Sequence, residues 1–163
     1  ALTMSNKIAV FNDGKIQQIS TPDVLYEKPD NSFVAQFIGE NNQIKGKVKS
    51  MNGKNCVVET DNGDEIVSLK ININSVGETS LLSLRPERVW VNVNEKNYEN
   101  NFEAKVEELI YLGDHVRTRV KVCGNNQFIV KIPNSSDHSD LKEGATVKLS
   151  WKADDTRALD FKA

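Results

Sequence analysis

The alternation of apolar and polar residues along the chain changes its period near residue 42. Before that point, the apolar run Ile8–Phe11 is followed by the turn signal Asn12-Asp13-Gly14 and by alternating residues over Lys15–Ile19, which predicts a β-hairpin. An unbroken apolar run is typical of a strand covered on both faces, although a short run also fits a piece of buried helix. We therefore expect another element to cover this hairpin.

Two short helices are expected directly after the hairpin. Thr21 can cap the first helix, Pro22 suits its first turn, and Pro29 ends it within about two turns. Apolar residues at helical spacing then follow Ser32, which we interpret as the N-cap of the second helix. Gly39 is expected to close that helix in the left-handed conformation.

Glu40–Asn42 is interpreted as a linker, and from Gln43 onward the pattern is that of short strands between turn signals. The predicted strands are Ile44–Lys49, Cys56–Thr60, Glu65–Leu69, Thr79–Leu84, Arg88–Val93, Phe102–Leu112, His115–Val122, Gln127–Ile132, Thr146–Trp151 and Ala158–Phe161. About ten short strands with almost no helical periodicity predict a mainly β fold, either an antiparallel barrel or a sandwich.

Composition narrows the class of protein. The 163 residues are 38% hydrophobic and 27% charged, with a formal net charge of −2, which fits a globular chain with one good core or two small ones. This charge gives no basic excess of the kind expected of a general nucleic-acid binder. No apolar run approaches the roughly 20 residues of a membrane helix, and no secretion signal is recognisable.

Chemical motifs are mostly missing. Cys56 and Cys123 lie far apart in apolar runs, and we interpret them as buried free thiols in a reducing compartment rather than as a disulfide or a reactive cysteine. His115 and His138 have no Cys or His at ligand spacing, so no dedicated zinc site is expected. Phosphate-binding loops and catalytic elbows are also missing, and the chain by itself is expected to catalyse nothing.

A basic stripe alternates along one predicted strand. Arg117, Arg119 and Lys121 share a face because side chains alternate. The stripe fits either a track for a phosphate backbone or the solvated face of a strand. We favour the solvated face, because no aromatic residues interleave with the charges to stack bases.

Two charged corners carry the remaining candidates for binding. Pro86 is expected to break one strand from the next and to turn Arg85, Glu87 and Arg88 outward. The pair Asp154-Asp155 lies between two predicted strands, where it fits a solvated turn better than a cation site.

The first part of the chain resembles a known family. "ALTMSNKIAVFNDGKIQQISTPDVLYEKPDNSFVAQFIGENN" is similar to the segment that follows the switch histidine in ABC-transporter ATPase subunits of the polyamine, sugar and iron importer group. The shared positions are Gly14, Gln18, Pro22, Tyr26, Pro29 and 33–39. Asn6 and Ser20 depart mildly from the family pattern, in which Asp and Gly are usual.

The remainder resembles the TOBE domain that follows the ATPase in this group. The matching stretches are "LRPERV", "YLGDHVRTRV" and "GATVKLSWKADDTRALD". The resemblance implies that residues 1–40 are the end of an ABC ATPase domain and residues 41–163 an OB-fold-like antiparallel β-barrel of TOBE type. The body of the ATPase, with its Walker motifs, is then expected before Ala1, so that a hairpin without its sheet would favour self-association of the chain.

The same resemblance implies a function. The chain is similar to the C-terminal regulatory and dimer-forming part of an ATP-hydrolysing subunit of an importer, most like those for spermidine and putrescine. ATP and Mg²⁺ would belong to the intact protein, at the cytoplasmic face of the inner membrane, with a second ATPase subunit and membrane permease subunits as partners. The candidate regulatory or interface residues are Arg85, Glu87, Arg88, Asp114, Trp151, Asp154, Asp155 and Arg157.

A regulatory ligand is a further expectation. A polyamine effector would need carboxylates, and the candidates are Glu87, Asp114, Asp154 and Asp155. The alternatives are a free-standing OB-like domain that binds nucleic acid, or one that binds a small anion through Arg85, Arg88 and backbone amides at the turns.

Overall fold

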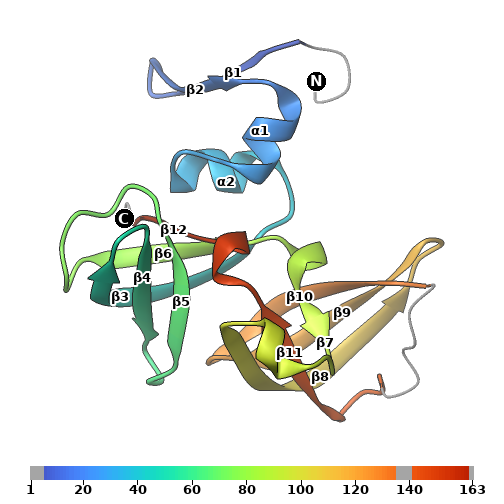
Figure 1. Ribbon diagram of the computed structural model, residues 1–163. Coiled ribbons are helices and arrows are strands. Elements are labelled where there is room, and N and C mark those ends of the chain that lie inside the picture. Colours follow the sequence, from blue (N-terminus) through green and yellow to red (C-terminus); the bar gives the residue numbers. More distant parts are fainter. Residues whose placement is uncertain (1–5, 135–140, 162–163) are drawn as a thin grey trace.

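The computed structural model describes residues 6–134 and 141–161, and it shows three parts (Figure 1). A hairpin and two helices lie on one side of a closed β-barrel, and a second, curled sheet lies beside the barrel. The fold is therefore mainly β with an OB-like barrel and two short helices, which confirms the expected fold class. No helix among the described residues is long and apolar enough to span a membrane.

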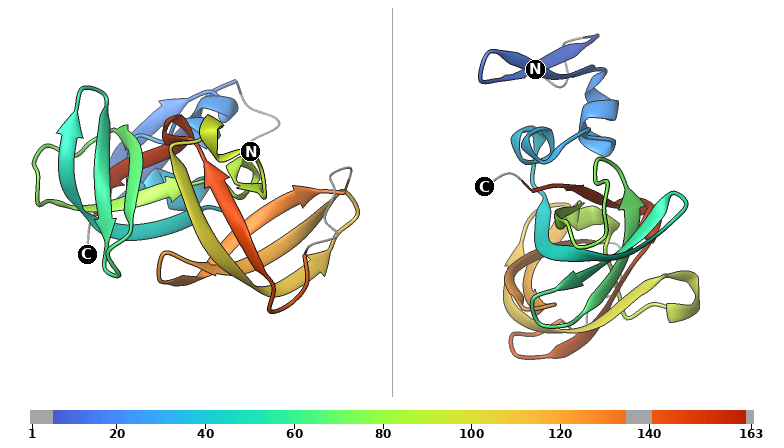
Figure 2. Two further views of the ribbon diagram at one scale, coloured as in Figure 1. Left: turned by 60° about the horizontal axis from the view of Figure 1, so that its bottom comes forward. Right: turned by 90° about the vertical axis from the view of Figure 1, so that its left-hand side faces the viewer.

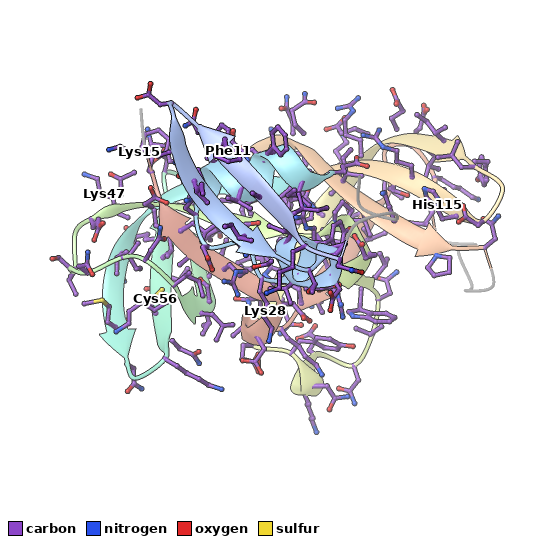
Figure 3. All side chains as sticks on the ribbon, turned by 90° about the horizontal axis from the view of Figure 1, so that it is seen from above. Phe11, Lys15, Lys28, Lys47, Cys56 and His115 are labelled. Atoms are coloured by element: carbon purple, nitrogen blue, oxygen red, sulfur yellow. The ribbon has the colours of Figure 1, made fainter. Side chains whose placement is uncertain are left out.

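The N-terminal part consists of strands β1 (Ile8–Asn12) and β2 (Lys15–Ser20) and helices α1 (Pro22–Glu27) and α2 (Ser32–Ile38). Val10, Leu25 and Val34 form its small core. The helices thus cover one face of the hairpin, between the hairpin and the barrel (Figure 2). Its other face stays exposed, and the view from above in Figure 3 shows Phe11 on this ribbon.

The ends of α2 differ from the expectation. The N-cap is Asn31, whose Oδ1 accepts a hydrogen bond from the Val34 amide at 3.0 Å, so that Ser32 is already inside the helix. Gly39 is extended rather than left-handed, with φ 173°. The chain leaves α2 straight towards β3 because Gly39 has no side chain to meet Tyr26, whose ring lies 3.2 Å from the place of a Cβ.

The barrel is closed by five strands in the order β12-β5-β4-β3-β6. Their bounds are β3 Asn42–Asn52, β4 Asn55–Thr60, β5 Glu65–Lys70, β6 Thr79–Leu84 and β12 Thr156–Asp160. Gly46 on β3 allows the closest approach, because a Cβ there would lie 2.5 Å from the carbonyl oxygen of Glu59.

The second sheet has the order β10-β9-β8-β11-β7. Its strands are β7 Trp90–Val91, β8 Asn100–Tyr111, β9 His115–Val122, β10 Asn125–Pro133 and β11 Thr146–Trp151. Trp151 lies inside it, fully buried between Phe102 and Phe128, and the barrel and the sheet share one hydrophobic core. Cys56 is buried and Cys123 half-buried, and both are free thiols as expected.

The two β units exchange strands. After β6, the chain passes through the 3₁₀ helix η1 (Pro86–Arg88) and adds β7 to the second sheet. After β11, it passes through η3 (Ala153–Asp155) and adds β12 to the barrel. A third 3₁₀ helix, η2 (Glu95–Asn97), precedes β8. The expected strand Arg88–Val93 starts later, at Trp90, because Pro86 starts η1 and keeps Arg88 in a helical turn, and β7 itself is two residues long.

The units also repeat in sequence. "NQIKGKVKS" at the start of β3 resembles "NNFEAKVEE" at the start of β8. Both strands shift register at corresponding points, between Val48 and Ser50 in β3 and between Val106 and Glu108 in β8. The order β5-β4-β3-β6-β12 in the barrel and the order β10-β9-β8-β11-β7 in the second sheet are therefore two copies of one strand arrangement. The last strand of each unit, β12 or β7, comes after the crossover that leaves the other unit.

Two buried asparagines join the units at equivalent positions. The Asn42 side chain donates to the Ile129 carbonyl at 2.7 Å and accepts from the Ile129 amide at 2.8 Å. The Asn100 side chain bonds the amide and carbonyl of Val67 at 2.8 and 2.9 Å. Each amide side chain thereby takes the place of a neighbouring strand's backbone.

Candidate functional site

The crossovers η1 and η3 meet the N-terminal helices and enclose a cavity. The cavity has a volume of about 180 Å³ and is lined by Arg85, Arg88, Asp154, Asp155 and Arg157, together with residues from Tyr26 to Pro29. The structure thus brings most of the candidate residues to one junction between the helices and the β units.

Arg85 points inward, against the expectation that it faces outward. It is 5% exposed. Its Nε and Nη2 donate to the Tyr26 carbonyl at 3.2 and 3.0 Å, and its Nη1 donates to the Glu40 carbonyl at 2.9 Å. The guanidinium also lies over the Tyr26 ring, 4.2 Å from its centroid. Burial lowers the pKa of Arg85, and the free carbonyls at the end of α1 are suitable partners for its charge.

Glu87 and Arg88 are exposed as expected, yet both contact α1. The Tyr26 hydroxyl donates to Glu87 Oε2, and Arg88 Nη2 lies 2.9 Å from Glu27 Oε1. Burial, with the hydrogen bond to Glu87, raises the pKa of Tyr26 to about 12. Arg85 therefore holds the main chain of α1, and Glu87 and Arg88 of η1 hold its side chains.

Strand β12, which follows the second crossover η3, holds the loop after α1 and the first residue of α2. Arg157 donates from Nε and Nη2 to the Pro29 carbonyl at 3.1 and 2.9 Å, and the Ser32 amide donates to Asp160 Oδ1 at 3.3 Å. Asp154 lies 3.9 Å from the Lys54 ammonium. Burial raises the pKa of Asp155, against the lowering effect of Arg88 and Lys152.

A second cavity of about 360 Å³ continues from the first past Arg88 and Asp155. Its other lining residues are Glu87, Trp90, Tyr98 and Lys152. Carboxylates beside aromatic rings can bind an organic cation, through charge and through the ring faces. Among the described residues no cluster of His, Cys, Asp or Glu could hold a metal ion.

Asp114 and Trp151 lie apart from this junction. Asp114 is exposed on the turn between β8 and β9, where the hydrogen bond with His115, 2.7 Å long, lowers its pKa. Figure 3 shows His115 at the far end of the second sheet. Trp151 is fully buried in the core. His138 lies outside the described residues.

The basic stripe is only partly the solvated face that we expected. Lys121 is exposed, but Arg117 binds Glu40 at 2.7 Å and Arg119 donates to the Asn126 carbonyl at 3.1 Å. Nothing in the sequence indicated Glu40 as the partner of Arg117, or Glu27 as the partner of Arg88. On the helix side of the junction, the sequence indicated Tyr26 and Pro29 through their family positions.

Comparisons with known proteins agree with this architecture. The TOBE domain family matches residues 82–159. Relatives described as spermidine/putrescine import ATP-binding protein PotA are 34% identical in Rubrobacter xylanophilus, over 94% of this chain and 40% of the relative, and 38% identical in Roseobacter denitrificans, over 83% and 37%. The chain thus spans about two fifths of the length of the curated relatives it matches.

A solved structure shares the fold. It is the cytoplasmic molybdate-binding protein ModG with molybdate bound, at a TM-score of 0.61 and 14% identity, covering 74% of this chain and 96% of that chain. At this identity the likeness shows the fold alone. Taken with the family match and the relatives, the chain belongs to the PotA-like ABC-transporter ATP-binding proteins, as their C-terminal TOBE region.

Proposed function

We propose that the chain is the regulatory and dimer-forming end of the ATP-hydrolysing subunit of an ABC importer for polyamines. The observation that carries this proposal is the junction, where Arg85 and Arg157 hold the backbone of α1 and of the loop after it. A displacement of Arg85, next to η1, or of Arg157 on β12 must move α1 and the loop after it, or break the bonds. The β units can therefore bias the state of whatever α1 and α2 belong to.

In this proposal, residues 1–40 end the ATP-binding domain and residues 41–163 form the regulatory TOBE domain. Exposed apolar side chains on the hairpin and on α2 support this division. On the hairpin, Phe11 is 60%, Ile16 53% and Ile19 54% exposed, and Phe37 on α2 is 65% exposed. Fully burying an exposed apolar side chain contributes ~1.5–3 kcal/mol, and we assign these side chains to contact with the rest of the ATP-binding domain, which would bind ATP and Mg²⁺.

The partners follow from the same assignment. A second ATPase subunit and membrane permease subunits would complete the importer at the cytoplasmic face of the inner membrane. The import function in the names of the relatives supports this arrangement.

The second cavity is our candidate for a regulatory polyamine site. Glu87 and Asp155 supply carboxylates, and Trp90 and Tyr98 supply ring faces, to a ligand whose charges are ammonium groups. Asp154 lines the adjoining cavity. Asp114 belongs to neither cavity among the described residues, so we leave it out of this site.

The test uses the intact ATPase, whose hydrolysis rate is measured with and without spermidine. We expect the double variant Glu87→Gln, Asp155→Asn to lose most of the spermidine response, because both carboxylates of the cavity become neutral. Asp114→Asn is the matched control, with the same loss of charge on the same β-domain, and should keep the full response. An unchanged response in the double variant would remove the ligand site from the proposal, and an ATPase with no response in any form would remove regulation by polyamines.

A further inference from the structure

The segment Glu40–Asn42, which follows α2 and ends on the first residue of β3, is held from several sides, although its sequence predicted a linker. The Ser83 hydroxyl donates to Asn41 Oδ1 at 2.8 Å, and the Asn42 side chain bonds Ile129 of β10. Glu40, the first residue of the segment, has the most partners. A true linker would leave such groups to water, so the segment has a defined position.

The Glu40 carboxylate lies between two cations of the second sheet. Oε1 accepts from Arg117 Nε and Nη2 at 3.1 and 2.7 Å, and Oε2 lies 3.2 Å from Lys131 Nζ. Arg117 on β9 and Lys131 on β10 are directly opposite in the strand register. Like charges in such a pair repel each other, and Glu40 supplies the negative charge between them.

The contacts of both carboxylate oxygens resist loss of the Glu40 charge. Burial raises the pKa of Glu40, but the hydrogen bonds from Arg117 and Lys131 outweigh it, and the pKa lies below its ordinary value. The carboxylate therefore stays charged and paired at neutral pH.

The main chain of Glu40 completes the connection. Its carbonyl accepts from Arg85 Nη1 at 2.9 Å, and Arg85 also holds the Tyr26 carbonyl of α1. One residue thus joins the β9–β10 hairpin, the Arg85 contact with α1 and the end of α2. We propose that Glu40 is a latch that couples the position of the β9–β10 hairpin to the stability of α2.

The regulatory meaning of this inference rests on the proposed function. The coupling between the β9–β10 hairpin and α2 does not, because it involves only residues of this chain. A partner or ligand that shifts β9 or β10 would strain the Glu40 contacts and loosen α2. The latch thereby connects the second sheet to α2 through the Glu40 side chain, next to the contact of Arg85 with α1.

The test is amide hydrogen exchange on the 163-residue chain. We expect Glu40→Gln to raise the exchange rates of the α2 amides by about two- to fivefold, the range given by a partly exposed ion pair. The amides of β4, inside the barrel, should keep their rates. The matched control Glu143→Gln removes the same charge from an exposed side chain and should change neither region.

A charge reversal distinguishes the latch from a general loss of stability. Glu40→Arg should loosen α2 further, and adding Arg117→Glu should return the α2 rates towards those of the parent chain. Unchanged α2 rates in Glu40→Gln, a matching rise in β4, or no rescue by the reversed pair would each overturn the latch. None of these results depends on ATP hydrolysis or on spermidine, so the latch and the proposed function can fail separately.

Discussion

Replacing Asn42 by alanine tests how the two β units are held together. The side chain is 4% exposed, and its two hydrogen bonds satisfy the Ile129 amide and carbonyl on β10, which has a neighbouring strand only on its other side. In the alanine variant both backbone groups of Ile129 lose their partner in a buried place. The equivalent change at Asn100, 1% exposed, removes the partner of Val67.

The magnitude follows from the groups left unpaired. Each lost hydrogen bond is worth ~0.5–1.5 kcal/mol net, and each buried backbone group without a partner costs ~1–3 kcal/mol. A water molecule that enters the space left by the amide recovers part of that loss. We therefore expect a decrease of ~2–4 kcal/mol in the free energy of unfolding for Asn42→Ala, and a similar decrease for Asn100→Ala.

Urea unfolding followed by tryptophan fluorescence measures this change. Trp151 is buried and Trp90 is 47% exposed, so a Trp90→Phe background leaves a reporter in the shared core. With a slope of ~2 kcal/mol per M urea, the expected loss moves the midpoint down by ~1–2 M. Asn126→Ala, at an exposed asparagine of the same strand, is the control and should stay within ~0.5 kcal/mol of the parent chain.

The result that would refute this reasoning is an Asn42→Ala variant as stable as Asn126→Ala. The bonds to Ile129 would then contribute nothing net, and the units would be held by apolar packing alone. Asn42→Asp adds a second check. Aspartate keeps the shape of the asparagine side chain but places an acceptor oxygen against the Ile129 carbonyl. It should lower the free energy of unfolding at least as much as alanine does.

Three further predictions concern single groups. The Tyr26 phenol should ionise near pH 12, and Glu87→Gln should bring its pKa back towards 10, as followed by ultraviolet absorbance. Because folding raises this pKa, the contribution of Tyr26 to the free energy of unfolding is complete below pH 10 and is lost as the pH rises towards 12. An unshifted titration would contradict the Tyr26–Glu87 bond. Gly46→Ala should destabilise the barrel by ~1–3 kcal/mol in urea unfolding, since its Cβ would overlap the Glu59 carbonyl, whereas an unchanged midpoint would mean that the strands can move apart. Cys123, whose pKa burial and Asp64 raise to about 12, should react with a disulfide reagent at pH 8 only after unfolding, and rapid labelling of the folded chain would contradict the raised pKa.

Local patterns account for the elements that the sequence predicted well. The hairpin over Ile8–Ser20, the helices after Thr21 and after Asn31, and most strands follow from alternation and turn residues, which act within a few neighbours. The Pro86 break follows from the missing amide of proline. The family motifs also predicted the TOBE region, because they lie in short contiguous stretches.

The errors concern groups whose partners are distant in the sequence. Arg85 was expected outside because it follows a strand and precedes a proline, yet carbonyls of Tyr26 and Glu40 hold it inside. Glu40 and Asn42 were interpreted as linker residues, because nothing nearby reveals Arg117 or Ile129. A search for internal repeats would have found the similarity between the starts of β3 and β8, and with it the equivalence of Asn42 and Asn100.

The sequence by itself determined the mainly β character, the positions of the strands and the family, since each depends on residues close together in the chain. Only the tertiary structure decided which strands exchange between the units and which side chains meet at the junction. The crossovers η1 and η3 are 67 residues apart in equivalent positions, Pro86 and Ala153. They form one site with α1 because the exchange of β7 and β12 brings both to the same end of the molecule, and that pairing is a property of the whole fold.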